Sequence, residues 1–275
     1  MSNGSGPHAA APAVVRLAVT EYGPEGGAPV VVLHGLFGSA RNWTTVCRRL
    51  AEHHHVLAPD LRNHGASPWS DEMTYDAMAG DVIALLEELS QQASLVGHSM
   101  GGKAAMLVAL RRPDLLRRLV VVDVAPVAYE STFDAYARAM LGVELAGVTR
   151  RAEVDAAIAP EVPDPGVRAF LLQNLAVEAG RATWRPNLFV LEREMGTVSG
   201  FPLVPAWARF ERPTMFVAGG QSDYIQPDHA DKVLELFPKA EVRVVPDAGH
   251  WVHAERLEDF LALLVPFLSE PAATS

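Results

Sequence analysis

The feature that most constrains the fold of this chain is a series of short, unbroken apolar runs rich in β-branched residues. Examples are Val30–Leu33, Leu119–Val122 and Met215–Ala218. A strand that is apolar at every position is buried on both faces, which is typical of a parallel sheet. The sequence therefore predicts a sheet that is covered on both sides. Its expected strands are Val14–Thr20, Val30–His34, His55–Pro59, Ser94–Gly97, Leu119–Asp123, Thr214–Ala218 and Glu241–Val245.

Helical patterns separate these strands, at Tyr75–Gln91, Gly101–Arg111, Asp228–Leu236 and Leu257–Leu268. Such alternation predicts an α/β fold with a mostly parallel central sheet and helices on both faces. The rhythm breaks over residues 126–212, which are helical in pattern, contain several prolines and show no convincing buried strand. We interpret 126–212 as a helical cap inserted into one core domain formed by residues 14–125 and 213–270.

The composition narrows the classes of function. The chain has 275 residues and a net charge of −10, which disfavours a nucleic-acid partner because such binding needs a basic surface. No run approaches the ~18 apolar residues of a membrane span, so we expect no integral membrane association. Residues 1–13 are interpreted as a disordered leader; they lack the features of a signal peptide, so a cytoplasmic location is expected. The sequence does not indicate an oligomeric state.

The sharpest chemical signal is the sequence GHSMG at residues 97–101. A short apolar strand precedes it and a helical pattern follows it. A sharp strand–turn–helix connection can present the hydroxyl of Ser99 clear of the backbone, and the flanking glycines allow neighbouring backbones to approach closely. This context predicts that Ser99 is a catalytic nucleophile.

A serine nucleophile needs a base, and the base needs an orienting carboxylate. Of ten histidines, His250 is the expected base, since it follows the last strand and precedes the last helix; His253 is the local alternative. Two acids remain open from position alone. Asp123 ends one strand and Asp223 follows the next, so both lie at the same expected edge of the sheet.

An oxyanion hole needs backbone N–H groups aimed at the developing charge. One donor is expected at Met100, the residue after the nucleophile, and the other at Leu36, in the loop after the second strand. The expected lining of the substrate pocket, an apolar set, also includes Phe37, Trp43, Tyr129, Phe189, Ile225 and Trp251.

Four segments together resemble the α/β-hydrolase fold superfamily: HGLFG at 34–38, DLRNHGAS at 60–67, GHSMGG at 97–102 and DAGHWVHAE at 247–255. Within it, the chain resembles the small bacterial YbfF-type esterases and their mitochondrial relatives. The resemblance implies a helical cap, no cofactor and no metal. In that smaller group the acid position maps onto Asp123, whereas the position common in the superfamily maps onto Asp223.

The expected function is that of a serine esterase, which cleaves small-molecule carboxylic esters with short to medium acyl chains through an acyl-enzyme intermediate. The same residues would also serve an acyl thioesterase or a perhydrolase of haloperoxidase type. A non-enzymatic alternative is a ligand-sensing protein of hydrolase fold.

Overall fold

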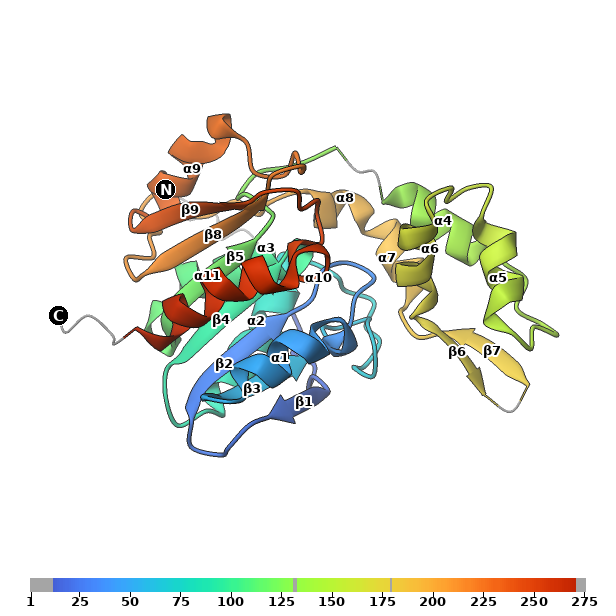
Figure 1. The fold of residues 1–275 in the computed structure, drawn as a ribbon, viewed down its shortest axis with the longest axis horizontal. Coiled ribbons are helices and arrows are strands. Elements are labelled where there is room, and N and C mark those ends of the chain that lie inside the picture. Colours follow the sequence, from blue (N-terminus) through green and yellow to red (C-terminus); the bar gives the residue numbers. More distant parts are fainter. Residues whose placement is uncertain (1–11, 131–132, 179, 271–275) are drawn as a thin grey trace, which may run out of the picture.

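The computed structural model describes residues 12–130, 133–178 and 180–270, so most of the expected leader lies outside the described residues. Its central element is a seven-stranded sheet in the order β1-β3-β2-β4-β5-β8-β9 (Figure 1). The strands are β1 (Val19–Tyr22), β2 (Ala28–Leu33), β3 (His54–Pro59), β4 (Ala93–His98), β5 (Leu116–Val122), β8 (Thr214–Gly219) and β9 (Ala240–Val245).

All neighbouring strands from β3 to β9 in that order are parallel, and only β1 pairs antiparallel, with β3. The first strand is shorter than expected from Val14–Thr20. Before it, the N–H of Val15 donates to the Asp81 carboxylate and the N–H of Ala18 donates to the Ser67 hydroxyl. Because these side chains bind the backbone here, strand pairing begins only at Val19.

Alternate residues of β2 enter the two halves of the core. Val30 and Val32 pack in the cluster that includes residues of α1 (Thr44–Leu50) and α11 (Leu257–Ser269). Val31 and Leu33 pack in the cluster that includes residues of α2 (Tyr75–Glu87) and α3 (Met100–Arg111). The sheet is thus covered on both faces, as predicted. The helices of the first face are α1 (Thr44–Leu50), α10 (Val252–Glu255) and α11 (Leu257–Ser269); those of the second are α2 (Tyr75–Glu87), α3 (Met100–Arg111) and α9 (Ala230–Leu236). Short 3-10 turns lie at Ala40–Trp43, Pro113–Leu115 and Pro227–His229.

Most of the described part of residues 126–212 lies to the right of the sheet in Figure 1. They form α4 (Asp134–Leu141), α5 (Arg151–Ile158), α6 (Pro165–Leu172), α7 (Leu188–Arg193) and α8 (Met195–Ser199). They also contain a hairpin of β6 (Leu175–Glu178) and β7 (Arg181–Trp184), so this segment is not purely helical as expected. Most residues of the hairpin are exposed or half-buried, and therefore no buried apolar run marks it in the sequence.

A buried ion pair holds the loop after β3 against α2. The Nε and Nη2 atoms of Arg62 donate to the two carboxylate oxygens of Asp81, each at 2.7 Å, and both side chains are fully buried. Burial raises the pKa of the Asp81 carboxyl, while Arg62 lowers it. Further N–H groups of Arg62 donate to the carbonyl oxygens of Ala13, Glu72 and Ala77, so the guanidinium is closely surrounded by acceptors.

We predict that Asp81→Asn lowers the free energy of unfolding by about 3 kcal/mol or more, because it leaves the buried charge of Arg62 with only the more distant and partly exposed carboxylate of Glu72, 4.0 Å away. Urea unfolding monitored by circular dichroism would measure it. Asp76→Asn on the same helix removes an exposed ion pair with Arg111 and should cost less than about 1 kcal/mol. Equal losses in the two variants would contradict the prediction.

Candidate active site

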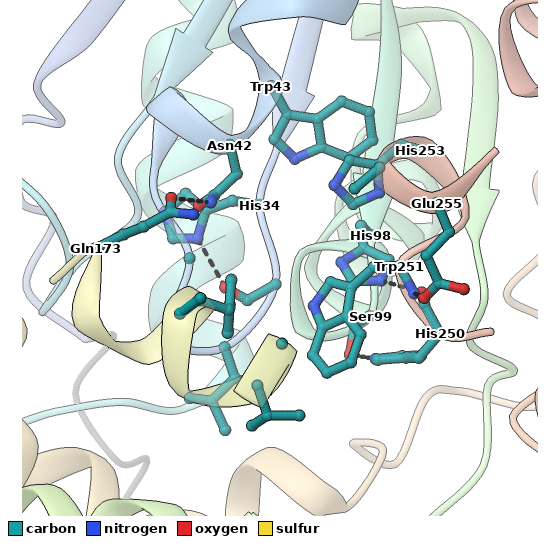
Figure 2. Close-up of a pocket in the computed structure, with 18 of the residues that line it drawn as sticks. His34, Asn42, Trp43, His98, Ser99, Gln173, His250, Trp251, His253 and Glu255 are labelled. Atoms are coloured by element: carbon teal, nitrogen blue, oxygen red, sulfur yellow. Dashed lines mark hydrogen bonds between the residues drawn. The ribbon is translucent and has the colours of Figure 1, made fainter. Parts of the chain in front are cut away.

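Three side chains from separate strand ends meet at the carboxyl edge of the sheet. Ser99 follows β4, Asp123 follows β5, and His250 lies in the loop after β9. The Nε2 atom of His250 is 3.0 Å from the Ser99 hydroxyl, and its Nδ1 atom is 2.8 Å from an Asp123 carboxylate oxygen. Figure 2 shows Ser99 and His250 side by side at one wall of a cavity. This chain of hydrogen bonds can move a proton from a hydroxyl to an imidazole whose cation faces a carboxylate.

The turn that presents Ser99 is strained and closely packed. Ser99 has φ 52° and ψ −120°, in the positive-φ half of the map that a residue with a side chain rarely occupies. A Cβ atom on Gly97 would lie 2.3 Å from the carbonyl oxygen of Gly101, and one on Gly101 would lie 2.4 Å from that of His34. Only glycine fits at these two positions, which explains the glycines of the GHSMG sequence.

The two candidate acids have different surroundings. Asp123 is fully buried, and its carboxylate accepts hydrogen bonds from the N–H of Gly219 at 2.9 Å and from the hydroxyl of Ser222, in addition to the contact with His250. Asp223 is exposed, and its carboxylate accepts from the amide of Gln226 at 3.4 Å. The structure thus brings Asp123 to His250, while the loop that carries Asp223 supplies donors to Asp123.

Several groups that the sequence reasoning missed hold the His250 loop in place. The Glu255 carboxylate accepts the N–H groups of Gly249 at 2.6 Å and Trp251 at 3.2 Å, on either side of His250. The Nε2 atom of His98 donates to the carbonyl oxygen of His250 at 2.8 Å. The ring of Tyr224 stacks on the imidazole with centroids 4.2 Å apart. Glu255 lies within the DAGHWVHAE segment, so its position was visible in the sequence although its role was not.

Burial favours the neutral form of two histidines beside the site, His98 and His253. Burial, together with the neighbouring His250 and His253, lowers the pKa of His98 well below its ordinary value. Burial also lowers the pKa of His253 to about 3, and this ring stacks on Trp43 with centroids 4.0 Å apart. The sequence alternative of His253 as the base is not supported by this geometry, because His250 contacts Ser99.

Two cavities adjoin Ser99. The larger has a volume of about 610 Å³, and its lining includes Trp43, Phe170, His250 and Trp251. On the wall opposite Ser99, the amide of Asn42 donates to Gln173 at 2.8 Å (Figure 2). The smaller cavity has a volume of about 30 Å³, and its lining includes Leu36, Met100, Lys103, Tyr129, Met195 and Val198. Trp43, Trp251 and Tyr129, which the sequence analysis expects in the substrate pocket, line these cavities.

Three other residues expected in the pocket lie elsewhere, which corrects the expectation. The side chain of Phe37 is 1% exposed and packs in the core beneath the loop. Phe189, on α7, is 76% exposed, because its helix turns the neighbouring Leu188 and Val190 inward instead. Ile225 packs half-buried against the core cluster. Residue type alone does not indicate which face of a loop or helix points inward.

The residues expected to supply the oxyanion donors lie beside Ser99. Leu36 and Met100 both line the smaller cavity together with Ser99. Met100 is the first residue of α3, and the first N–H groups of a helix have no acceptor within it. The N-terminus of α3 also adds positive potential at this point. These N–H groups could receive a negatively charged oxygen.

Neither a metal site nor a membrane span is found in the described ranges. Within residues 12–130, 133–178 and 180–270, no three side chains of His, Cys, Asp or Glu are grouped so that they could hold a metal ion. In the same part of the chain, every helix is too short or too polar to cross a bilayer.

This strand order, with a sharp serine turn after β4, is typical of the hydrolases with an α/β fold. A family model described as alpha/beta hydrolase family matches residues 30–263. The chain belongs to the alpha/beta hydrolase family. Within that family it is a hydrolase of the esterase and lipase type, as its relatives indicate.

The relatives are similar over most of their length. The sn-1-specific diacylglycerol lipase ABHD11 of Mus musculus is 41% identical over 87% of this chain and 80% of its own. Esterase YbfF of Escherichia coli is 34% identical over 92% of this chain and 98% of its own. A solved marine microorganism esterase is 30% identical with a TM-score of 0.89, covering 92% of this chain and 100% of that one. The resemblance found in the sequence motifs is confirmed.

We predict that His253→Phe makes the stability of the protein less sensitive to acid. Because the pKa of His253 is about 3 in the folded state and 6.5 in the reference state, the unfolded chain takes up the proton first as pH falls. Stability is therefore lost below pH ~6.5, by up to about 1.4 kcal/mol per pH unit from this group. Phe keeps a ring on Trp43 and removes the titration.

The measurement is urea unfolding at neutral pH and at several acidic values. His53→Gln, at an exposed histidine, serves as the control and should keep the wild-type slope of stability against pH. The same slope in His253→Phe and in the wild type would show that His253 does not contribute.

Proposed function

We propose that this protein is a serine esterase that cleaves small-molecule carboxylic esters with short to medium acyl chains. The observation that carries the proposal is the continuous set of hydrogen bonds from Ser99 through His250 to Asp123. Membership of the alpha/beta hydrolase family, and relatives named as esterases and lipases, support it.

In the proposed mechanism the Ser99 oxygen attacks the ester carbonyl carbon while His250 Nε2 takes the hydroxyl proton. The carbonyl oxygen gains negative charge and is stabilised by the N–H groups of Leu36 and Met100. The bond to the alcohol oxygen then breaks, and His250 returns the proton to that oxygen. Asp123 stabilises the imidazolium throughout. Water, deprotonated by His250, attacks the acyl group on Ser99, and the acid leaves as the Ser99 hydroxyl re-forms.

Residues 126–212 act in this proposal as a cap over the site. Three hydrogen bonds from this segment to the core support that role. The side-chain amide of Asn174 donates to the carbonyl oxygen of Phe37 at 2.7 Å, and the backbone N–H of Asn187 donates to the carbonyl oxygen of Asn63 at 2.9 Å. The side-chain oxygen of Gln173 accepts from the amide of Asn42. They hold α6 and α7 against the loops at the carboxyl edge, where a cap can exclude water from the ester.

We predict that Ser99→Ala abolishes hydrolysis of p-nitrophenyl esters and labelling by a fluorophosphonate probe, because it removes the hydroxyl that lies 3.0 Å from His250 Nε2. The probe reports the nucleophile independently of the substrate. A panel that adds acyl thioesters and peracid formation would separate the esterase from the thioesterase and perhydrolase alternatives. Turnover retained in Ser99→Ala would contradict the proposal, and labelling of the wild type without any turnover would favour the ligand-sensing alternative.

We further predict that Asp123→Asn lowers kcat by about 10⁴-fold with little change in KM, because the amide neither holds the productive tautomer of His250 nor stabilises its cation. Asp223→Asn is the matched control and should retain activity near that of the wild type. Steady-state kinetics on one p-nitrophenyl ester would measure both. A large loss in Asp223→Asn with activity retained in Asp123→Asn would reverse the assignment of the acid.

A further inference from the structure

The two cavities that adjoin Ser99 suggest that the two halves of an ester are held separately. The cavities share Leu36, Ser99 and Phe133 and otherwise have different linings. When an ester carbonyl lies at Ser99 with its oxygen toward Leu36 and Met100, two substituents remain on the carbonyl carbon. These are the acyl chain and the alcohol oxygen, and they point in different directions.

The position of His250 decides which half enters which cavity. The leaving alcohol oxygen must come within hydrogen-bond reach of His250 Nε2 to receive its proton. Among the described residues, His250 lines the large cavity and not the small one, whose lining contains Met100 instead. We propose that the large cavity holds the alcohol half and the small cavity the acyl half, so that the preferred substrates are short-acyl esters of bulky alcohols. The inference rests on the proposed function.

The volumes set the sizes of the two halves. A cavity of about 30 Å³ is roughly two to three times the space that one water molecule requires, so it has room for the methyl or ethyl of an acetyl or propionyl group and little more. A cavity of about 610 Å³ lies within the range that holds ligands of drug size. The acyl chain is therefore the restricted half, and the alcohol is the permissive one.

The wall that closes the small cavity is firmly held. Met195 and Val198, both buried side chains of α8, form part of it. The carbonyl oxygens at the C-terminal end of α8, and that of the following Gly200, accept hydrogen bonds from core side chains. The hydroxyl of Tyr75 donates to Val198 at 2.6 Å, and the ammonium of Lys103 donates to Ser199 at 2.8 Å and to Gly200.

Lys103 is itself positioned by the nucleophile turn. It lies one helical turn after Ser99, and its N–H donates to the Ser99 carbonyl oxygen at 3.0 Å. Its buried ammonium lies 4.6 Å from the ring centre of Tyr129, which also lines the small cavity. Because α8 is held by Lys103 of α3, the helix that directly follows Ser99, the wall cannot easily recede to admit a longer acyl chain.

The test is a two-way panel of esters. One series varies the acyl chain from acetyl to octanoyl on 1-naphthol, and the other varies the alcohol from methanol to 1-naphthol on an acetyl group. For the wild type we expect kcat/KM to fall by roughly tenfold or more for each methylene that no longer fits the small cavity. In the second series we expect kcat/KM to be retained or to rise with the size of the alcohol.

Matched variants assign the halves to the cavities. Met195→Ala enlarges the small cavity and should raise the ratio of hexanoate to acetate turnover at least tenfold without changing the alcohol preference. Phe170→Ala, on the large cavity, should change the alcohol preference and leave the acyl ratio as in the wild type. If Met195→Ala does not fold, Val198→Ala is used in its place. The panel of esters on the wild type tests the inference without any variant.

A wild-type preference for long acyl chains, for instance a long-chain diacylglycerol over the acetate esters, would overturn the inference. So would an acyl ratio that responds to Phe170→Ala and not to Met195→Ala. In both cases turnover that is lost in Ser99→Ala leaves the serine esterase itself standing, although a long-chain preference would also remove the short to medium acyl range proposed above. Turnover that survives in Ser99→Ala would instead remove the proposed function itself.

Discussion

Parallel pairing of β2, β4, β5, β8 and β9 is the constraint on which the rest of the structure depends. Parallel strands deliver their carboxyl ends to one edge, and the loops beyond these ends can meet there although they are far apart in sequence. The registers of these pairs place the ends of β4, β5 and β8 level with one another. Ser99, Asp123 and the donors at Gly219 and Ser222 are close for this reason. The loop after β9 then adds His250.

The same edge concentrates backbone strain. Ser99 and Asp123 follow adjacent strands, and both have positive φ, at 52° and 51°. Such conformations are costly for residues with side chains and persist where the surroundings overdetermine them. The N–H of Ser99 donates to the carbonyl oxygen of Val122 at 3.0 Å, and that of Asp123 donates to Val217 at 2.8 Å. Sheet hydrogen bonding therefore extends into both turns and holds the two side chains toward the same point.

The segment 126–212 shapes the site from the other side. Its α6 contributes to the large cavity and its α8 to the small one, so the two proposed subsites depend on different helices of one segment. The core carries the proposed chemistry on rigid strand ends. The segment above it sets how much room each half of a substrate has. A change in α6 or α8 can therefore alter the substrate range without disturbing the sheet.

The sequence by itself determined the parallel sheet, the serine turn and the histidine after the last strand. These features depend on local patterns: apolar runs, glycines at 97 and 101, and the order of elements along the chain. The choice between Asp123 and Asp223 was not local, because both follow strands at the same edge. The tertiary structure distinguishes the two through side-chain direction, since Asp123 is buried against His250 and Asp223 faces solvent. The exposure of Phe189, the exposed hairpin and the unequal sizes of the two cavities were likewise decided only by packing, because residue type does not specify which face of an element meets the core.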